Sequence, residues 1–74
     1  MELIRIRKIR ETHNLTQQQI AEMLGLNREV YRRFEEGTRE IPARYIIALA
    51  QYYDVSVDYI VGLTDMKKWE DIKD

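Results

Sequence analysis

The 74-residue sequence contains no cysteine, one histidine and one serine. Without cysteine it has no disulfide framework, no thiolate zinc site and no thiol nucleophile, and it is compatible with a reducing compartment. The single histidine, His13, has no ligating neighbours, which is typical of a structural residue, and the single serine, Ser56, stands at a helix-capping position. The carboxylates are scattered without glycine loops or metal spacing. We therefore expect neither an enzyme nor a bound metal or cofactor.

Long apolar runs, low-complexity segments and strand-like alternation are also missing. No run is long enough to span a membrane, and the first residues, Met1 to Arg5, do not form a signal peptide. We therefore expect a cytoplasmic protein with no membrane partner and no evident small-molecule ligand. One proline and three glycines, set against 45% hydrophobic and 34% charged residues, indicate one compact, helix-rich domain.

The charge of the chain is unevenly distributed. The formal net charge is −1, but residues 1–44 hold nine basic against seven acidic side chains, whereas residues 45–74 hold three against six. The basic excess is therefore confined to the N-terminal part. Local potential governs the approach to phosphates, so the acidic total does not exclude a nucleic-acid partner.

Hydrophobic spacing and capping residues predict an all-α domain of five helices. The first covers residues 2–12 and turns Arg10 inward with Ile6 and Ile9, and Asn14 then tolerates a left-handed stop. The other predicted boundaries are a capping box at Thr16 and Gln19, a turn at Gly25, an N-cap at Asn27, a stop at Gly37, a first turn at Pro42 and a cap at Ser56. Core candidates in the fifth helix are Val57, Ile60 and Val61.

The third predicted helix, residues 28–36, separates its packing side chains from its charges. On a helical wheel, Val30, Tyr31 and Phe34 fall on one side, and the opposite side carries Arg28, Glu29, Arg32, Arg33 and Glu36. A helix of this kind, held by a short preceding helix and a tight turn, fits the major groove of DNA. Gln17 and Gln18 begin the preceding helix, where free amides suit a phosphate oxygen. The alternative is that the arginines form an ordinary solvated face.

The stretch LTQQQIAEMLGLNREVYRRFEEG, from Leu15 to Gly37, resembles the helix-turn-helix of the Cro and repressor-type family, also called the xenobiotic-response-element family. The resemblance continues through ALAQYYDVSVDYIVG and covers about residues 3–62. It implies a five-helix, lambda-repressor-like domain that binds double-stranded DNA through its third helix. It also implies a transcriptional regulator that represses as a homodimer on a palindromic operator.

The resemblance also assigns roles to single positions. By position, Gln17 would hold a phosphate, Arg39 would lie in a loop that contacts the DNA backbone, and the base-contacting positions would be Asn27, Arg28, Glu29 and Arg33. The chain departs from the family at Glu36 and Thr38, where Asn and Lys are common.

Arg10 and Glu35 are predicted to form a structural ion pair between the first and third helices. Arg10 lies in an apolar stripe, and Glu35 flanks the buried side of residues 28–36. Because such a pair is costly to desolvate, it is expected to fix the orientation of the third helix more than to add stability.

The C-terminal residues suggest a contact with a second copy. We expect a DNA-binding domain over residues 1–62 and a short tail over residues 63–74, with candidate dimer contacts at Tyr59, Val61, Leu63, Met66 and Trp69. A tail that caps its own core is the alternative. Core packing accounts for most of the tyrosines, whereas Tyr52 is expected to be exposed or to touch a partner. A protein-interaction or antitoxin-like adaptor remains the second functional hypothesis.

Overall fold

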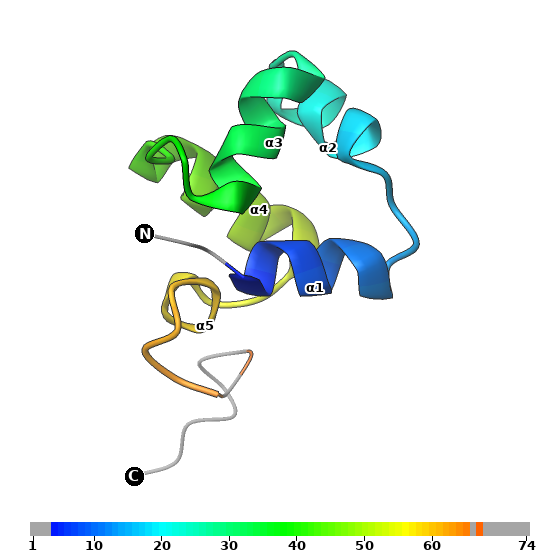
Figure 1. Cartoon of the computed structure of the whole chain (residues 1–74). Coiled ribbons are helices and arrows are strands. Elements are labelled where there is room, and N and C mark those ends of the chain that lie inside the picture. The colour runs from blue at the N-terminus through cyan, green and yellow to red at the C-terminus, as the bar shows by residue number, and fades with distance from the viewer. Residues whose placement is uncertain (1–3, 66, 68–74) are drawn as a thin grey trace, which may run out of the picture.

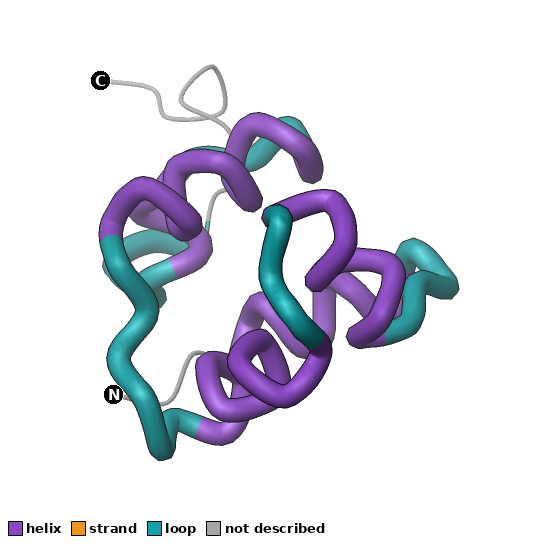
Figure 2. Tube along the Cα trace, turned by 90° about the horizontal axis from the view of Figure 1, so that it is seen from above, coloured by secondary structure: helices purple, strands orange, loops and turns teal. Residues whose placement is uncertain are grey.

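The structure is a computed structural model that describes residues 4–65 and residue 67. Five helices make up its fold. In chain order they are α1 (Ile4–Thr12), α2 (Gln17–Leu24), α3 (Arg28–Glu36), α4 (Ala43–Tyr53) and α5 (Val57–Ile60), as labelled in Figure 1. Figure 2 shows that short loops join them, and the described residues contain no strand. The predicted all-α, five-helix class is confirmed. No helix within the described range is long and apolar enough to cross a membrane.

Every helix contributes at least one side chain to a single core. The buried members are Ile6, Ile9, Ile20, Ala21, Tyr31, Phe34, Leu49, Ala50, Tyr53 and Ile60. Leu24 and Leu26 are half-buried and close the corner between α2 and α3. The core thereby fixes α3 against α1, α2 and α4 while its opposite side stays outside.

The connection between α2 and α3 is a tight turn of three residues. Thr16 and Gln19 form the predicted capping box at the start of α2. Gly25 ends that helix with φ of 73°, a left-handed conformation that residues with a Cβ rarely adopt. Asn27 then accepts a 2.9 Å hydrogen bond from the backbone N–H of Val30 and so begins α3. The turn sets the angle at which α3 leaves α2.

Two local predictions need correction. Pro42 is the N-cap of α4 with φ of −62° and ψ of 148°, so it precedes the first turn and does not lie within it. Val57 was expected in the core but is exposed, because α5 has only four residues and turns Ile60 inward instead. The stop at Asn14 has the predicted left-handed φ of 57°, and Asp54 ends α4 with the same value.

Arg5 ties the end of the described chain to α1. Its guanidinium donates to the carbonyl oxygens of Tyr59 and Thr64 at 3.1 and 2.6 Å, and it pairs with Asp65 at 2.5 Å. The same group lies 4.5 Å from the centre of the Tyr59 ring. We call these contacts the Arg5 clasp, and they hold residues 59–65 beside the start of α1.

Candidate nucleic-acid interface

The outward side of α3 carries five charged side chains, which we call the charged face: Arg28, Glu29, Arg32, Arg33 and Glu36. The opposite side buries Tyr31, Phe34 and Glu35, so the helix is divided along its length as the sequence predicts. Three arginines stand against two glutamates, and the charged face therefore has a formal charge of +1. The excess of positive charge on this surface is small.

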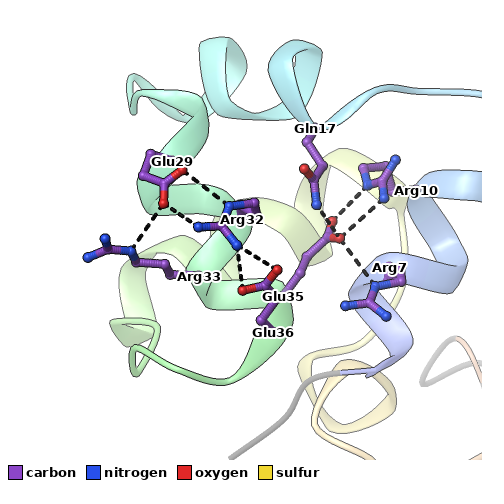
Figure 3. Close-up of polar contacts among 8 residues, drawn as sticks. All are labelled: Arg7, Arg10, Gln17, Glu29, Arg32, Arg33, Glu35 and Glu36. Carbon is purple, nitrogen blue, oxygen red and sulfur yellow. Dashed lines mark hydrogen bonds and ion pairs between the residues drawn. The ribbon is translucent and has the colours of Figure 1, made fainter.

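Salt bridges connect most of the charged face (Figure 3). Arg32 pairs with Glu29 through its Nε and Nη2 groups, and its Nη1 group donates to both carboxylate oxygens of Glu36 at 2.7 Å. Arg33 Nε lies 3.4 Å from the Glu29 carboxylate. The Arg32 guanidinium lowers the pKa of Glu29, and the two carboxylates raise the pKa of Arg32. Both shifts favour the charged forms of Glu29 and Arg32.

Arg28 differs from the other two arginines of the charged face. It is exposed on the first turn of α3, and no ion pair involves it within residues 4–65 and 67. It also lines a shallow groove together with Arg10, Leu15, Thr16, Gln17 and Gln18. Its guanidinium is therefore the cation of α3 that is most available to a ligand.

Behind the charged face, Glu35 joins three helices (Figure 3). Arg10 of α1 makes a bidentate contact with its carboxylate at 2.7 and 3.2 Å, and Gln17 Nε2 of α2 donates to it at 3.1 Å. Arg7 adds a second cation at 3.6 Å. We call Glu35, Arg7, Arg10 and Gln17 the Glu35 cluster. The structure thus contains the expected Arg10–Glu35 pair, and Arg10 also donates to the Leu15 carbonyl at 2.8 Å.

Electrostatics within this cluster favour the charged forms. Burial by itself would raise the pKa of Glu35, but the hydrogen bonds from Arg10 and Gln17 outweigh it and lower that pKa. The hydrogen bond to Glu35 likewise raises the pKa of Arg10. The Tyr31 hydroxyl is buried near this carboxylate without a hydrogen bond of standard geometry, and burial raises its pKa. The cluster is a built interior site that holds α3 in place.

The remaining predicted DNA contacts surround α3. Gln18 is exposed at the start of α2 and donates to Glu22 at 3.0 Å. Gln17 is half-buried, and its amide nitrogen faces Glu35, so a phosphate contact through it stays a prediction. Asn27 is exposed but spends its side-chain oxygen on the α3 cap. Arg39 is exposed after α3, with its guanidinium 5.9 Å from the centre of the Phe34 ring.

A surface helix that follows a tight turn and is braced from behind by a core and an ion pair is the arrangement of a helix-turn-helix. The profile of the helix-turn-helix family matches residues 6–60. The chain belongs to the Cro/C1-type helix-turn-helix family. This family consists of DNA-binding transcription regulators.

Three curated relatives support the assignment. The chain is 44% identical over 61 residues to the uncharacterized HTH-type transcriptional regulator YobD of Bacillus subtilis (strain 168), covering 82% of this chain and 54% of that protein. It is 36% identical over 67 residues to the uncharacterized HTH-type transcriptional regulator YqaE of the same organism, covering 89% of this chain and 58% of that protein.

The third relative is named as an antitoxin. It is the antitoxin PezA of Streptococcus pneumoniae serotype 4 (strain ATCC BAA-334 / TIGR4), 37% identical over 57 residues, covering 77% of this chain and 36% of that protein. The chain thus spans about half the length of the first two relatives. No solved structure matches the chain significantly.

The candidate dimer contacts have mixed surroundings. Leu63 is 78% exposed, whereas Tyr59 and Val61 are half-buried and pack against the core. Met66 and Trp69 lie outside the described residues. Tyr52, which was expected to be exposed or to touch a partner, is half exposed on α4.

Several functional side chains were missed from the sequence. Arg7 was not recognised as a second partner of Glu35, and the Arg5 clasp joins residues that are more than 50 positions apart. No sequence signal indicated either contact. The salt bridges of Arg32 had a signal, because Glu29 and Glu36 stand three residues before it and four residues after it.

Proposed function

We propose that the chain is a sequence-specific, double-stranded-DNA-binding regulator that represses transcription as a homodimer on a palindromic operator. The observation that carries this proposal is the exposed charged face of α3 held from behind by the Glu35 cluster. Because α3 is braced by α1 and α2 at once, its side chains are presented at a fixed angle. Fixed presentation is what reading base edges requires.

In the proposed complex, α3 lies in the major groove, which is about 12 Å wide and admits one helix. Arg28 on the first turn makes a forked contact with a guanine, and Glu29 beside it accepts from a cytosine or excludes wrong bases. Asn27 lies at a base-contacting position before the first turn, Arg33 reaches a base or a phosphate one turn after Arg28, and Arg32 lies at the edge of the contact. Gln17, Gln18 and Arg39 hold the phosphate backbone on either side. The groove lined by Gln17, Gln18 and Arg28 supports this order.

A dimer is part of the proposal because one recognition helix reads few base pairs. We place the DNA-binding unit in residues 1–62 and the second-copy contact on α5 and residues 63–74. The exposed Leu63 supports this placement, next to Tyr59 and Val61. Two copies related by a two-fold axis would read two half-sites about one helical turn apart. We expect the protein to act in the cytoplasm.

The test is a fluorescence-anisotropy titration with labelled duplex DNA at low and moderate salt, followed by selection of binding sites from a random library. We expect a steep salt dependence and a selected consensus with two-fold symmetry. A chain that binds no duplex at low salt would refute the proposal. A consensus with a single half-site, bound by one copy in sedimentation, would refute the dimer alone.

The second candidate is an antitoxin-like adaptor that uses the same fold to bind a protein. The similarity to the antitoxin PezA favours it. The two functions differ in the role of Arg28, because an adaptor that contacts its partner elsewhere keeps that contact in an Arg28→Ala variant. An Arg28→Ala variant that loses DNA binding supports the regulator as the primary function.

A further inference from the structure

The salt bridges of the charged face use up one arginine almost completely. Arg32 turns its Nε and Nη2 groups to Glu29, and its Nη1 group is shared by both oxygens of Glu36 at 2.7 Å. All three nitrogen atoms of its guanidinium therefore already face carboxylates. One N–H of Nη2 stays uncommitted, so a phosphate can gain a bidentate contact with Arg32 only by displacing one of the carboxylates.

Glu36 is an unfavourable residue for the stability of α3. It is the last residue of the helix, where the macrodipole is negative and basic side chains are the stabilising ones. Its pair with Arg32 is exposed, and exposed pairs at this spacing stabilise helices only slightly. Helix stability therefore does not account for a carboxylate at this position.

We propose that Glu36 is an electrostatic brake on DNA affinity, acting by holding Arg32 away from phosphates. This inference rests on the proposed DNA-binding function and adds a residue that sets the DNA affinity of the same surface. A carboxylate at the rim of the interface repels phosphates of every sequence, and it also keeps one cation out of the phosphate grip. Non-specific binding consists almost entirely of such contacts, so the brake weakens non-specific binding more than base reading.

The brake leaves the base-reading groups in place. Arg28 has no ion pair within the described residues, so it can reach a base without breaking a salt bridge. Glu29 stays fixed between Arg32 and Arg33, with Arg33 at 3.4 Å. Arg32 thus positions Glu29 through one pair of salt-bridge contacts. Its other contacts, to Glu36, restrain Arg32 itself. The arrangement lowers the total affinity for DNA and increases the discrimination between sequences.

The experiment compares Glu36→Gln with the parent chain on a mixed-sequence duplex, by anisotropy over a range of salt concentrations. We expect Glu36→Gln to bind about twofold to fivefold more tightly at low salt, the range that release from an exposed ion pair allows, with a salt slope steeper by about one unit. The matched control is Glu11→Gln, which changes the net charge equally at an exposed position of α1 away from the charged face. Helicity and thermal melting show that each variant is folded.

A double-variant cycle identifies Arg32 as the route. In an Arg32→Ala background, Glu36→Gln should lose most of its effect, because no cation is left to release. An equal gain in both backgrounds would reduce Glu36 to simple repulsion and overturn the proposal, as would a gain no larger than that of Glu11→Gln. If the parent binds DNA and Arg28→Ala weakens it while Glu36→Gln changes nothing, the brake fails and the function stands. If no variant binds DNA, both fail.

Discussion

Helix α3 takes part in two charge clusters that differ in burial and therefore in role. The Arg10–Glu35 pair lies inside, with side-chain exposures of 12% and 0%, whereas the Arg32–Glu29 pair lies outside, with exposures of 35% and 54%. Glu35 and Glu36 are sequence neighbours, yet one faces α1 and the other faces solvent. Because neighbouring residues point to different sides of a helix, Glu35 forms a buried structural ion pair, whereas Glu36 forms an exposed pair whose partner can be replaced.

The comparison teaches what each kind of ion pair can contribute. A buried pair is costly to break because the remaining charge stays unsolvated, so it fixes a geometry. An exposed pair gains little, because water and salt replace either partner easily. The interior pair is suited to orienting α3, and the exterior pairs are suited to exchange with DNA phosphates.

The largest effect is expected from breaking the interior pair. Arg10→Met should destabilise the fold by about 3–5 kcal/mol, because Glu35 would remain buried with the Gln17 amide and a single, more distant cation, Arg7, beside it. In a domain of this size that corresponds to a fall of about 15 °C or more in Tm, measured by thermal melting. DNA binding should fall with the loss of structure.

The control removes both charges. Arg10→Met combined with Glu35→Leu should recover much of the lost stability, since no charge is left buried and unpaired. A single Arg10→Met variant that melts like the parent would contradict the structural role given to the interior pair.

The next effect tests the exterior cluster at its free member. Arg28→Ala should cost about 1–3 kcal/mol of binding to the selected site and relax the preference at one base position, because it removes a forked contact with a guanine. Its Tm should stay close to that of the parent, since Arg28 is exposed. Site selection with the variant is the measurement, and an unchanged consensus of equal stringency would show that Arg28 reads no base.

Acid should distinguish the two clusters through stability. The folded-state pKa of Glu35 is lowered below its usual 4.5, so its contribution is complete above about pH 4.5 and is lost as pH falls through the folded value. Thermal melts from about pH 7 down to about pH 3 should show a steeper loss of Tm for the parent than for the Arg10→Met, Glu35→Leu double variant. Identical acid profiles would mean that Glu35 contributes nothing through its charge.

The smallest effect is expected at the periphery. Arg39→Ala should weaken binding to all sequences alike and make the salt slope shallower by about one unit, as the loss of one phosphate contact predicts. Its selected consensus should match that of the parent. A changed base preference would instead assign Arg39 to reading the sequence.

Local signals made most of the fold predictable. The cap at Asn27, the capping box at Thr16 and the stop at Gly37 act through residues three to five positions away, so short patterns identify them. The inward position of Arg10 followed from helical spacing. The prediction that Val57 is buried was wrong, because tertiary packing orients a single-turn helix and spacing alone does not determine which side of it is buried.

The site was predictable only as a set of positions. Helical spacing placed Arg28, Arg32 and Arg33 on one side of α3, and the resemblance gave Arg28 and Arg33 base-contacting positions, but neither indicated which of the three is engaged in salt bridges. Their difference depends on which carboxylates their flexible side chains meet, and two spacings compete for Arg32. Arg7 and Arg5 were missed because their partners are distant in sequence and are determined only by the packed fold.

The Arg5 clasp gives the domain a mechanical property. In Figure 1, α5 and the clasped residues lie at the end of the molecule away from α2 and α3. A pull on the chain beyond residue 65 would load α1 and α5 together through the two carbonyl contacts and the Asp65 pair. We expect single-molecule pulling to show one unfolding step in the parent and an earlier detachment of α5 in Arg5→Ala. The clasp thus joins residues 59–65 to α1, the helix that braces α3 from behind, so that they resist a pull as one mechanical unit.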